Sequence, residues 1–377
     1  MWALSLPFFL ILLLFLTGNE HILYGLRGTY LQGKGRPDID DMELFDLSTV
    51  KAGVHEPFAE ALEPGALDEA ALSYMDSLET TAYLVWYKDT LRYERYSMGY
   101  DRSTLSNSFS MAKSFTSLAV GAAHDQGLID PEDFVYEYLP RFNEGQSKKL
   151  KVKHLLQMRS NIDFGESYSN PFGYQAKAYY GKDLQGITEP YRVSSEPGTL
   201  WKYEGGNTLL LAEILKKTTN KQVSQWFGDY FWSKIGTEKD AFWNLDIAGG
   251  DEKAFSGFYA TARDFGRIGH LMLHNGNWKG KQLISEEWIN ASIQPHGTPN
   301  EEGEDILHYG YQWWLAMPDE DPWHFQARGM RGQYIVVIPE KELVIVRLGH
   351  ARDEVKTTRN MTQDLKRWVD FGLTFAD

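Results

Sequence analysis

Two pairs of strand-like segments, one near each end of the chain, limit the possible folds more than any other feature. Residues 82–97, AYLVWYKDTLRYERYS, are rich in aromatic and β-branched residues on both sides of a short polar turn. Near the other end, QYIVVI (333–338) and LVIVRL (343–348) flank a turn that begins at Pro339. Such pairs are typical of β-hairpins. We expect the two hairpins to meet in one sheet.

The middle of the chain has a different character. Helical and loop-like segments such as NTLLLAEILKK fill roughly residues 125–300. Within residues 111–122, apolar side chains recur at helical spacing. We therefore predict a mixed α/β (α+β) fold over residues 76–377, with an antiparallel sheet flanked by helices and a mostly helical insertion. Residues 18–75 are predicted to be a linker that leads into an N-terminal helix near Glu56–Leu78.

Charge and composition exclude several functions. The net charge of −14 argues against a nucleic-acid partner. The absence of cysteine excludes a thiol nucleophile and any Cys-ligated metal. The ten histidines show no spacing such as His-Glu-x-x-His, and no glycine-rich phosphate loop occurs. We expect no metal and no cofactor.

The first seventeen residues, MWALSLPFFLILLLFLT, are almost entirely apolar. A run of this length lies between a signal-peptide core and a short membrane anchor, and both readings stay open. Export to the cell envelope, periplasmic or membrane-anchored, is the favoured location. Basic residues follow the run, so the cytoplasmic side is not excluded. Oligomeric state is not predicted.

A Ser-x-x-Lys pattern occurs at Ser110–Lys113 and again at Ser48–Lys51. One helical turn separates the two side chains, so the lysine amine can reach the serine hydroxyl. Ser110 begins a strongly periodic helix, where free N–H groups favour a developing negative charge. Ser48 lies in the acidic linker with no amphipathic helix after it. The alternative for Ser110 is a helix-capping serine beside a solvated lysine.

Two further segments carry polar groups suited to catalysis. In PGTLWKYEGGNTLLLAEIL, Tyr203 precedes an apolar helix, and beside an ammonium it is expected to ionise more easily than its usual pKa of about 10 allows. It would then serve as general base and later as acid; the alternative is a packed core tyrosine. In ARGMRGQYIVVI, Gly329 and Gly332 would let the backbone approach a substrate. The N–H groups of Met330 and Ser110 would form an oxyanion hole.

These blocks together resemble the serine β-lactamase and penicillin-binding protein superfamily. They are NSFSMAKSF, VKHLLQMRSNIDFGESY, PGTLWKYEGGNTLLLAEIL, DAFWNLD, GFYATARDFGRIGHLML and ARGMRGQYIVVIPEKEL. The likeness covers about residues 78–350 and is strongest to the class C and family VIII esterase branch, particularly 6-aminohexanoate-dimer hydrolases.

The resemblance implies a role for each matching residue. Ser110 matches the nucleophile, Lys113 its proton-transfer partner, and Tyr203 the tyrosine of the Tyr-x-Asn motif, although Gly205 replaces the asparagine. Ala327-Arg328-Gly329 replaces Lys-Thr-Gly, so Arg328 and Gly329 would contact the substrate. Tyr168 resembles the substrate-facing tyrosine that assists a leaving amide nitrogen.

The resulting hypothesis is a serine hydrolase that forms an acyl-enzyme with a small linear amide or ester. The alternatives are a D-amino-acid peptidase of the penicillin-binding type and a catalytically impaired acyl-binding sensor. Glu166 and His154 are interpreted as non-catalytic, Glu166 as structural or substrate-facing and His154 as a buried structural residue.

Overall fold

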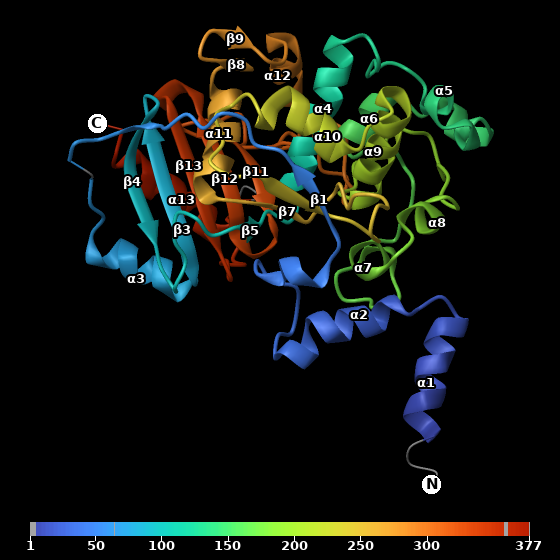
Figure 1. Cartoon of the computed structure of the whole chain (residues 1–377). Coiled ribbons are helices and arrows are strands. Elements are labelled where there is room, and N and C mark those ends of the chain that lie inside the picture. The colour runs from blue at the N-terminus through green and yellow to red at the C-terminus, as the bar shows by residue number, and fades with distance from the viewer. Residues whose placement is uncertain (1–4, 64, 358–360, 377) are drawn as a thin grey trace.

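A seven-stranded sheet lies at one side of the molecule in the computed structural model, which describes residues 5–63, 65–357 and 361–376 (Figure 1). The strand order is β10-β11-β12-β13-β3-β4-β2, and every neighbouring pair is antiparallel except β2 with β4. The strands of this sheet are β2 (Ala59–Glu60), β3 (Thr80–Tyr87), β4 (Thr90–Tyr96), β10 (Trp314–Leu315), β11 (Phe325–Gly329), β12 (Gln333–Ile338) and β13 (Leu343–Gly349).

Both predicted hairpins are confirmed, as β3–β4 and β12–β13. They meet through β13 and β3, where Leu343 lies opposite Tyr87 and Val346 opposite Leu84. Strands β3, β12 and β13 are buried along nearly their whole length. The two ends of the chain therefore close one sheet, as the sequence predicts.

Helices cover both faces of this sheet (Figure 1). On one face, α11 packs so closely that a Cβ on Gly266 would lie 2.5 Å from the Trp86 ring. On the other face α3 and α13 bury Trp368 and Leu365 against the strands. The described helices are α1 (Ser5–Leu16), α2 (His21–Gly28), α3 (Glu69–Ser77), α4 (Met111–Asp125), α5 (Val135–Tyr138), α6 (Val152–Leu156), α7 (Tyr174–Tyr180), α8 (Leu184–Thr188), α9 (Gly205–Thr219), α10 (Val223–Phe227), α11 (Ala262–Leu273), α12 (Glu286–Ser292) and α13 (Gln363–Leu373).

The mostly helical insertion is organised around α4, which is buried along nearly its whole length. Helix α9 packs against α4, and α10 packs against both. A second sheet, with order β1-β6-β7-β5, sets the start of α4, because β5 ends three residues before Ser110 and pairs with β7. Its strands are β1 (Leu47–Val50), β5 (Ser106–Asn107), β6 (Ala241–Asn244) and β7 (Phe258–Ala260); a separate hairpin is formed by β8 (Asn277–Trp278) and β9 (Lys281–Gln282).

Residues 18–75 do not behave as a plain linker. Strand β1 pairs with β6, Ile39 is fully buried, and the Asp38 carboxylate lies 2.7 Å from the His350 imidazole. The helix expected near Glu56–Leu78 is confined to Glu69–Ser77, where the Asp68 side chain accepts a hydrogen bond from the third helical N–H. The capping side chain of Asp68 marks this start, because it satisfies a helical N–H that has no partner within the helix.

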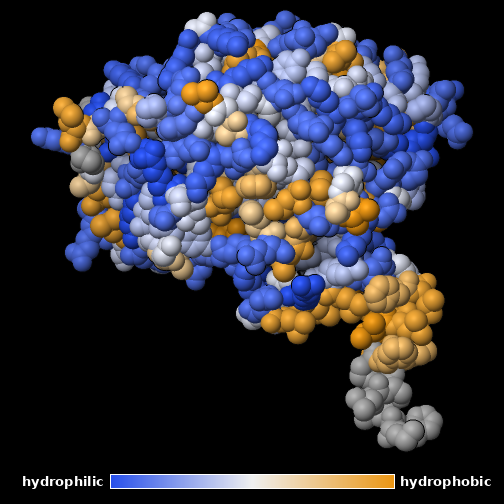
Figure 2. Space-filling model, in the orientation of Figure 1, coloured by the Kyte–Doolittle hydropathy of each residue, from blue (hydrophilic) through white to orange (hydrophobic). Residues whose placement is uncertain are grey.

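The apolar helix α1 extends away from the body, as the orange projection in Figure 2 shows. Its described side chains from Phe8 to Leu16 are mostly exposed. In the part of the chain that the structure describes, no helix is both long enough and apolar enough to cross a bilayer. Residues 1–4 of the apolar run lie outside the described residues. Export and anchoring stay predictions.

Candidate active site

Ser110 occupies the N-cap of α4 at the end of a tightly fixed turn. Phe109, immediately before it, has a φ of 45°, a left-handed conformation that is unfavourable for a side chain with a Cβ. The turn holds this geometry because the Asn107 side chain accepts a hydrogen bond from the Phe109 N–H, and the Ser108 N–H donates to Phe258 O in β7. Such backbone strain is common where a side chain must be presented at a fixed angle.

Lys113 lies one turn into α4, and its Nζ is 3.0 Å from Ser110 Oγ. The amine also donates to Phe255 O at 3.0 Å, and the side chain is only 2% exposed. Burial lowers the pKa of Lys113 below its ordinary value of 10.5, although Tyr168 and Glu166 act in the opposite direction. A lysine with a lowered pKa is more often neutral, and a neutral amine accepts a proton.

Tyr203 reaches the same point from the segment that precedes α9. Its side chain is hydrogen-bonded to Ser110, and Lys113 Nζ lies 4.9 Å from the centre of its ring. The expected easier ionisation is wrong. Burial raises the pKa of Tyr203 above 10, and this effect exceeds the opposing effects of the Ser110 hydrogen bond and the Arg328 charge. Desolvation thus favours the neutral form of both groups, the deprotonated amine of Lys113 and the protonated phenol of Tyr203.

The carboxylate of Glu166 lies beside Gly205, which has no side chain to fill this space. A Cβ on Gly205 would be 3.1 Å from Glu166 Oε1, which accepts a hydrogen bond from the Gly206 N–H at 3.0 Å. The carboxylate thus caps the start of α9, where the helix dipole favours negative charge. Burial raises the pKa of Glu166, and the Lys113 charge opposes the rise. A side chain at position 205 would require small shifts of Glu166 and of the Phe255 ring, which would be 3.0 Å from the added Cβ.

Tyr168 is 68% exposed, yet it interacts electrostatically with Lys113, Tyr203 and Glu166. The residue as a whole is therefore exposed, and its hydroxyl lies within electrostatic range of the three candidates. Desolvation of that hydroxyl raises the pKa of Tyr168 to about 12, although Lys113 opposes the rise. The phenol thus carries its proton at neutral pH.

The third segment reaches the site at the end of β11. A Cβ on Gly329 would lie 2.1 Å from Ser108 O, so this glycine lets β11 approach the turn before Ser110. The close approach is therefore to the protein's own backbone. Met330 follows at the first position of a 3₁₀ helix over Met330–Gly332. Its N–H as an oxyanion donor stays a prediction.

Arg328 also belongs to β11, and its guanidinium lies 5.0 Å from the centre of the Trp314 ring. Two of its nitrogens donate to Gln326 Oε1, at 2.9 and 2.7 Å. Burial lowers the pKa of Arg328 to about 10. Its position near Tyr203 is shown by their electrostatic interaction, but its contact with substrate stays a prediction.

Sequence reasoning did not identify Trp314, whose side chain is hydrogen-bonded to Tyr203 and whose ring centre is 5.2 Å from the Tyr203 ring. It also missed Phe255 as the carbonyl partner of Lys113. Neither residue carries a spacing signal, because each reaches the site from a distant segment. Only the fold reveals them.

In the second Ser-x-x-Lys pattern, the serine and the lysine each interact with a different partner. Ser48 lies in β1 and donates to the buried Glu252 at 2.8 Å, while Lys51 forms an exposed ion pair with Asp240. His154 is buried, and desolvation lowers its pKa to about 4, consistent with a structural role.

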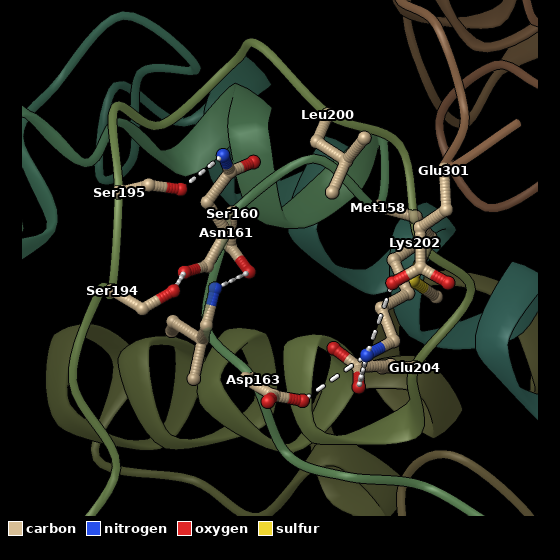
Figure 3. Close-up of a pocket in the computed structure, with 11 residues that line it drawn as sticks. Met158, Ser160, Asn161, Asp163, Ser194, Ser195, Leu200, Lys202, Glu204 and Glu301 are labelled. Atoms are coloured by element: carbon tan, nitrogen blue, oxygen red, sulfur yellow. Dashed lines mark hydrogen bonds and ion pairs between the residues drawn. The ribbon is translucent and has the colours of Figure 1, made fainter. Parts of the chain in front are cut away.

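A pocket of about 160 Å³ lies beside the residues that flank Tyr203 in the chain (Figure 3). Lys202 and Glu204, which flank Tyr203, line it, whereas Ser110, Lys113 and Tyr203 do not. Lys202 Nζ lies 3.1 Å from Asp163, 3.5 Å from Glu204 and 3.6 Å from Glu301. The pocket is a charged neighbour of the catalytic candidates, separate from them.

The description "Beta-lactamase" belongs to the family profile that matches residues 67–365, most of the chain. The chain belongs to the beta-lactamase family. This confirms the resemblance and the fold predicted from the sequence, and places the Ser110 helix, the Tyr203 segment and β11 inside the matched region.

Individual relatives are hydrolases. A 6-aminohexanoate-dimer hydrolase of Paenarthrobacter ureafaciens is 27% identical over 288 residues, covering 71% of this chain and 72% of that protein. A Bacillus anthracis structure described as a 6-aminohexanoate-dimer hydrolase superposes with a TM-score of 0.75 at 23% identity, covering 89% of this chain and 92% of the other. A family VIII carboxylesterase has a TM-score of 0.64 at 17% identity, covering 81% and 95%. At these identities the two structures establish the fold alone.

Proposed function

We propose that this protein is a serine hydrolase that forms an acyl-enzyme at Ser110 with linear amides or esters. The observation that carries the proposal is the contact of Lys113 Nζ with Ser110 Oγ at 3.0 Å, made by a buried amine with a lowered pKa. A nucleophile and a base within hydrogen-bonding distance are the core of nucleophilic catalysis. Tyr203, in the segment that precedes α9, is hydrogen-bonded to the same serine.

In acylation, the neutral Lys113 amine takes the Ser110 proton as Oγ bonds to the substrate carbonyl carbon. The carbonyl oxygen becomes an oxyanion, which the N–H groups of Ser110 and Met330 are proposed to stabilise. Tyr203 carries its proton because burial raises its pKa, so it donates that proton to the departing nitrogen or oxygen. The bond to the leaving group then breaks. The Lys113 ammonium returns a proton to Tyr203.

In deacylation, water takes the place of the serine hydroxyl and the same two residues move the protons. A water molecule attacks the ester carbon as its proton passes to the neutral amine of Lys113, after Lys113 has lost its own proton to Tyr203. The Ser110 oxygen then leaves and regains a proton from the same pair. No cofactor is required for any of these steps.

Two features favour linear substrates over β-lactams. The Glu166 carboxylate borders the space beside Lys113, where it would repel the carboxylate of a penicillin-like compound. Arg328, the cation in place of Lys-Thr-Gly, already donates two hydrogen bonds to Gln326. An ester needs the least help from the site, because its alkoxide leaves without protonation by a strong acid. A linear amide relies on Tyr203, with Tyr168 as a second donor.

The test is kcat/KM of the purified full chain toward a short-chain aryl ester, a linear amide such as the 6-aminohexanoate dimer, and benzylpenicillin in one buffer. We expect the ester to be fastest, the amide slower and the penicillin slowest. Each missing hydrogen bond to substrate costs about 1–3 kcal/mol, tenfold or more in rate. Preference for the penicillin over the ester by more than tenfold would contradict this order.

A D-alanyl-D-alanine peptide and a mass measurement cover the two alternatives. Turnover of the D-amino-acid peptide above all other substrates would favour the peptidase. A lasting adduct at Ser110 without turnover of any substrate would favour the acyl-binding sensor. The Tyr168→Phe variant tests the second proton donor, because it should slow the amide more than the ester.

A further inference from the structure

Helix α11 carries two histidines four residues apart at its C-terminal end, His270 within the helix and His274 as its C-cap. Side chains at this spacing lie on the same helix face. A third group joins them from far along the chain, because Asp89 in the β3–β4 turn contacts both imidazoles. The reaction proposed at Ser110 involves none of these three residues.

The distances suit a shared ion. Asp89 Oδ1 lies 3.0 Å from His270 Nδ1 and 2.7 Å from His274 Nε2, and one ligand atom of each residue lies within 4.8 Å of the others. A metal bound by nitrogen and carboxylate oxygen has bonds of about 2.0–2.2 Å, which separates its neighbouring ligand atoms by about 3–3.5 Å. Only small side-chain movements would open the present cluster to that size.

The surroundings hold two of the ligands in place. His270 is buried and packs against Phe58 and Trp86, with ring centres 5.0 and 5.6 Å away. Asp89 and Lys88 both have φ near +50°, which gives the hairpin a two-residue turn, and Lys88 N donates to Glu342 O of the neighbouring turn. Ligands held by packing and turn geometry lose little entropy when an ion binds.

The charges around the cluster favour a cation. Asp89 and, at longer range, Glu342 are negative toward His274. The opposing cation on the same helix is Arg267, which donates to the backbone oxygens of Ile235 and Glu56. The Nε2 atom of His270 is buried without a hydrogen-bond partner among the described residues, so the ring has one polar contact, through Nδ1.

The cluster is also accessible. The side chain of Asp89 is 60% exposed and that of His274 40%, so a hydrated ion can reach them and keep water in its remaining positions. It lies at the opposite end of α11 from the Ser110 turn, since α11 begins just after β7. Twelve helical residues at 1.5 Å each separate the two ends by roughly 18 Å.

We propose that Asp89, His270 and His274 bind one Zn²⁺-like divalent transition-metal ion that fastens the C-terminal end of α11 to the β3–β4 turn. Two imidazoles and one carboxylate suit zinc, cobalt or nickel and disfavour magnesium or calcium, which prefer oxygen ligands. The ion would join residues 181 positions apart in the chain. It would act on stability and would not enter the reaction at Ser110.

The experiment is calorimetric titration of Zn²⁺ into the tag-free, chelator-treated full chain, repeated with Mg²⁺. We expect one Zn²⁺ per chain, no comparable Mg²⁺ binding, and a higher Tm with Zn²⁺. His274→Ala and Asp89→Asn change exposed residues, so both variants should fold, and each should weaken Zn²⁺ binding by tenfold or more. His55→Ala, an exposed histidine elsewhere, is the matched control and should bind like the wild type.

Three results would overturn the proposal: no stoichiometric Zn²⁺ binding, equal binding by His274→Ala and wild type, or a Tm that Zn²⁺ leaves unchanged. Each would mean that the three residues form only a hydrogen-bonded connection. Ester hydrolysis by His274→Ala should match the wild type at every Zn²⁺ concentration, which separates this site from the proposed function.

Discussion

The proton chemistry proposed for Ser110 depends on two neighbours whose pKa values burial moves in opposite directions. Desolvation lowers the pKa of Lys113, because its charged form is the protonated one, and raises that of Tyr203, because its charged form is the deprotonated one. The pair therefore consists of a neutral base and a neutral acid over a shared pH range. An ionised tyrosine, which the sequence suggested, is unnecessary.

This assignment predicts the pH profile of ester hydrolysis. kcat/KM should rise with pH as Lys113 loses its proton, with a midpoint below 10.5, and should fall only above pH 10 as Tyr203 ionises. Lys113→Met should remove the rising limb and lower the rate by about 10²–10⁴-fold. Tyr168→Phe is the control and should keep the limb. A folded Lys113→Met variant with the wild-type profile would disprove the role of the amine.

At the scale of single elements, the N-terminus of α9 brings together two carboxylates. Glu166 caps the helix from the side, and Glu204 is its N-cap residue, only 1% exposed. Burial raises the pKa of Glu204 to about 7, with Lys202 opposing and Glu166 reinforcing the rise. The same short segment thus carries the catalytic candidate Tyr203 and a carboxyl group that titrates near neutrality.

Glu204 should make stability depend on pH. Its folded pKa lies above its unfolded value of 4.5, so its favourable contribution is complete below pH 4.5 and is lost as pH rises through 7. The difference amounts to at most about 3 kcal/mol. Urea unfolding at pH 4.5, 5.5 and 7 should show a smaller loss in Glu204→Gln than in the wild type.

Glu301→Gln is the matched control, because Glu301 contacts the same lysine but is exposed. It should follow the wild-type curve. If Glu204→Gln showed the full wild-type dependence on pH, the buried carboxyl would not be its source.

At the scale of the whole molecule, the sequence predicts those helices and hairpins whose conformation depends on residues near one another in the chain. The hairpins, the helix after Ser110 and the helix after Tyr203 all follow from hydrophobic periodicity and turn residues. The meeting of β13 with β3 could be inferred because both strands are too apolar to stand at an edge. The family blocks then predict that Ser110, Lys113 and Tyr203 lie together, and the structure brings them together.

What the sequence could not predict depends on distant partners. Strand β1 has only four residues, LSTV, and is recognisable only beside β6. The raised pKa of Tyr203 follows from its burial among residues of distant segments, which no local pattern contains. The Asp89–His270–His274 cluster likewise requires the fold, since one ligand comes from a turn and two from a helix.

The role of Ser110 as the nucleophile can be tested by intact mass and peptide mapping after exposure to a fluorophosphonate. We expect one adduct per chain, on the peptide that contains Ser110. The adduct should be absent in Ser110→Ala and unchanged in Ser48→Ala, whose serine is hydrogen-bonded to Glu252 in a different sheet. An adduct that persists in Ser110→Ala, or that disappears in a folded Ser48→Ala variant, would contradict this role.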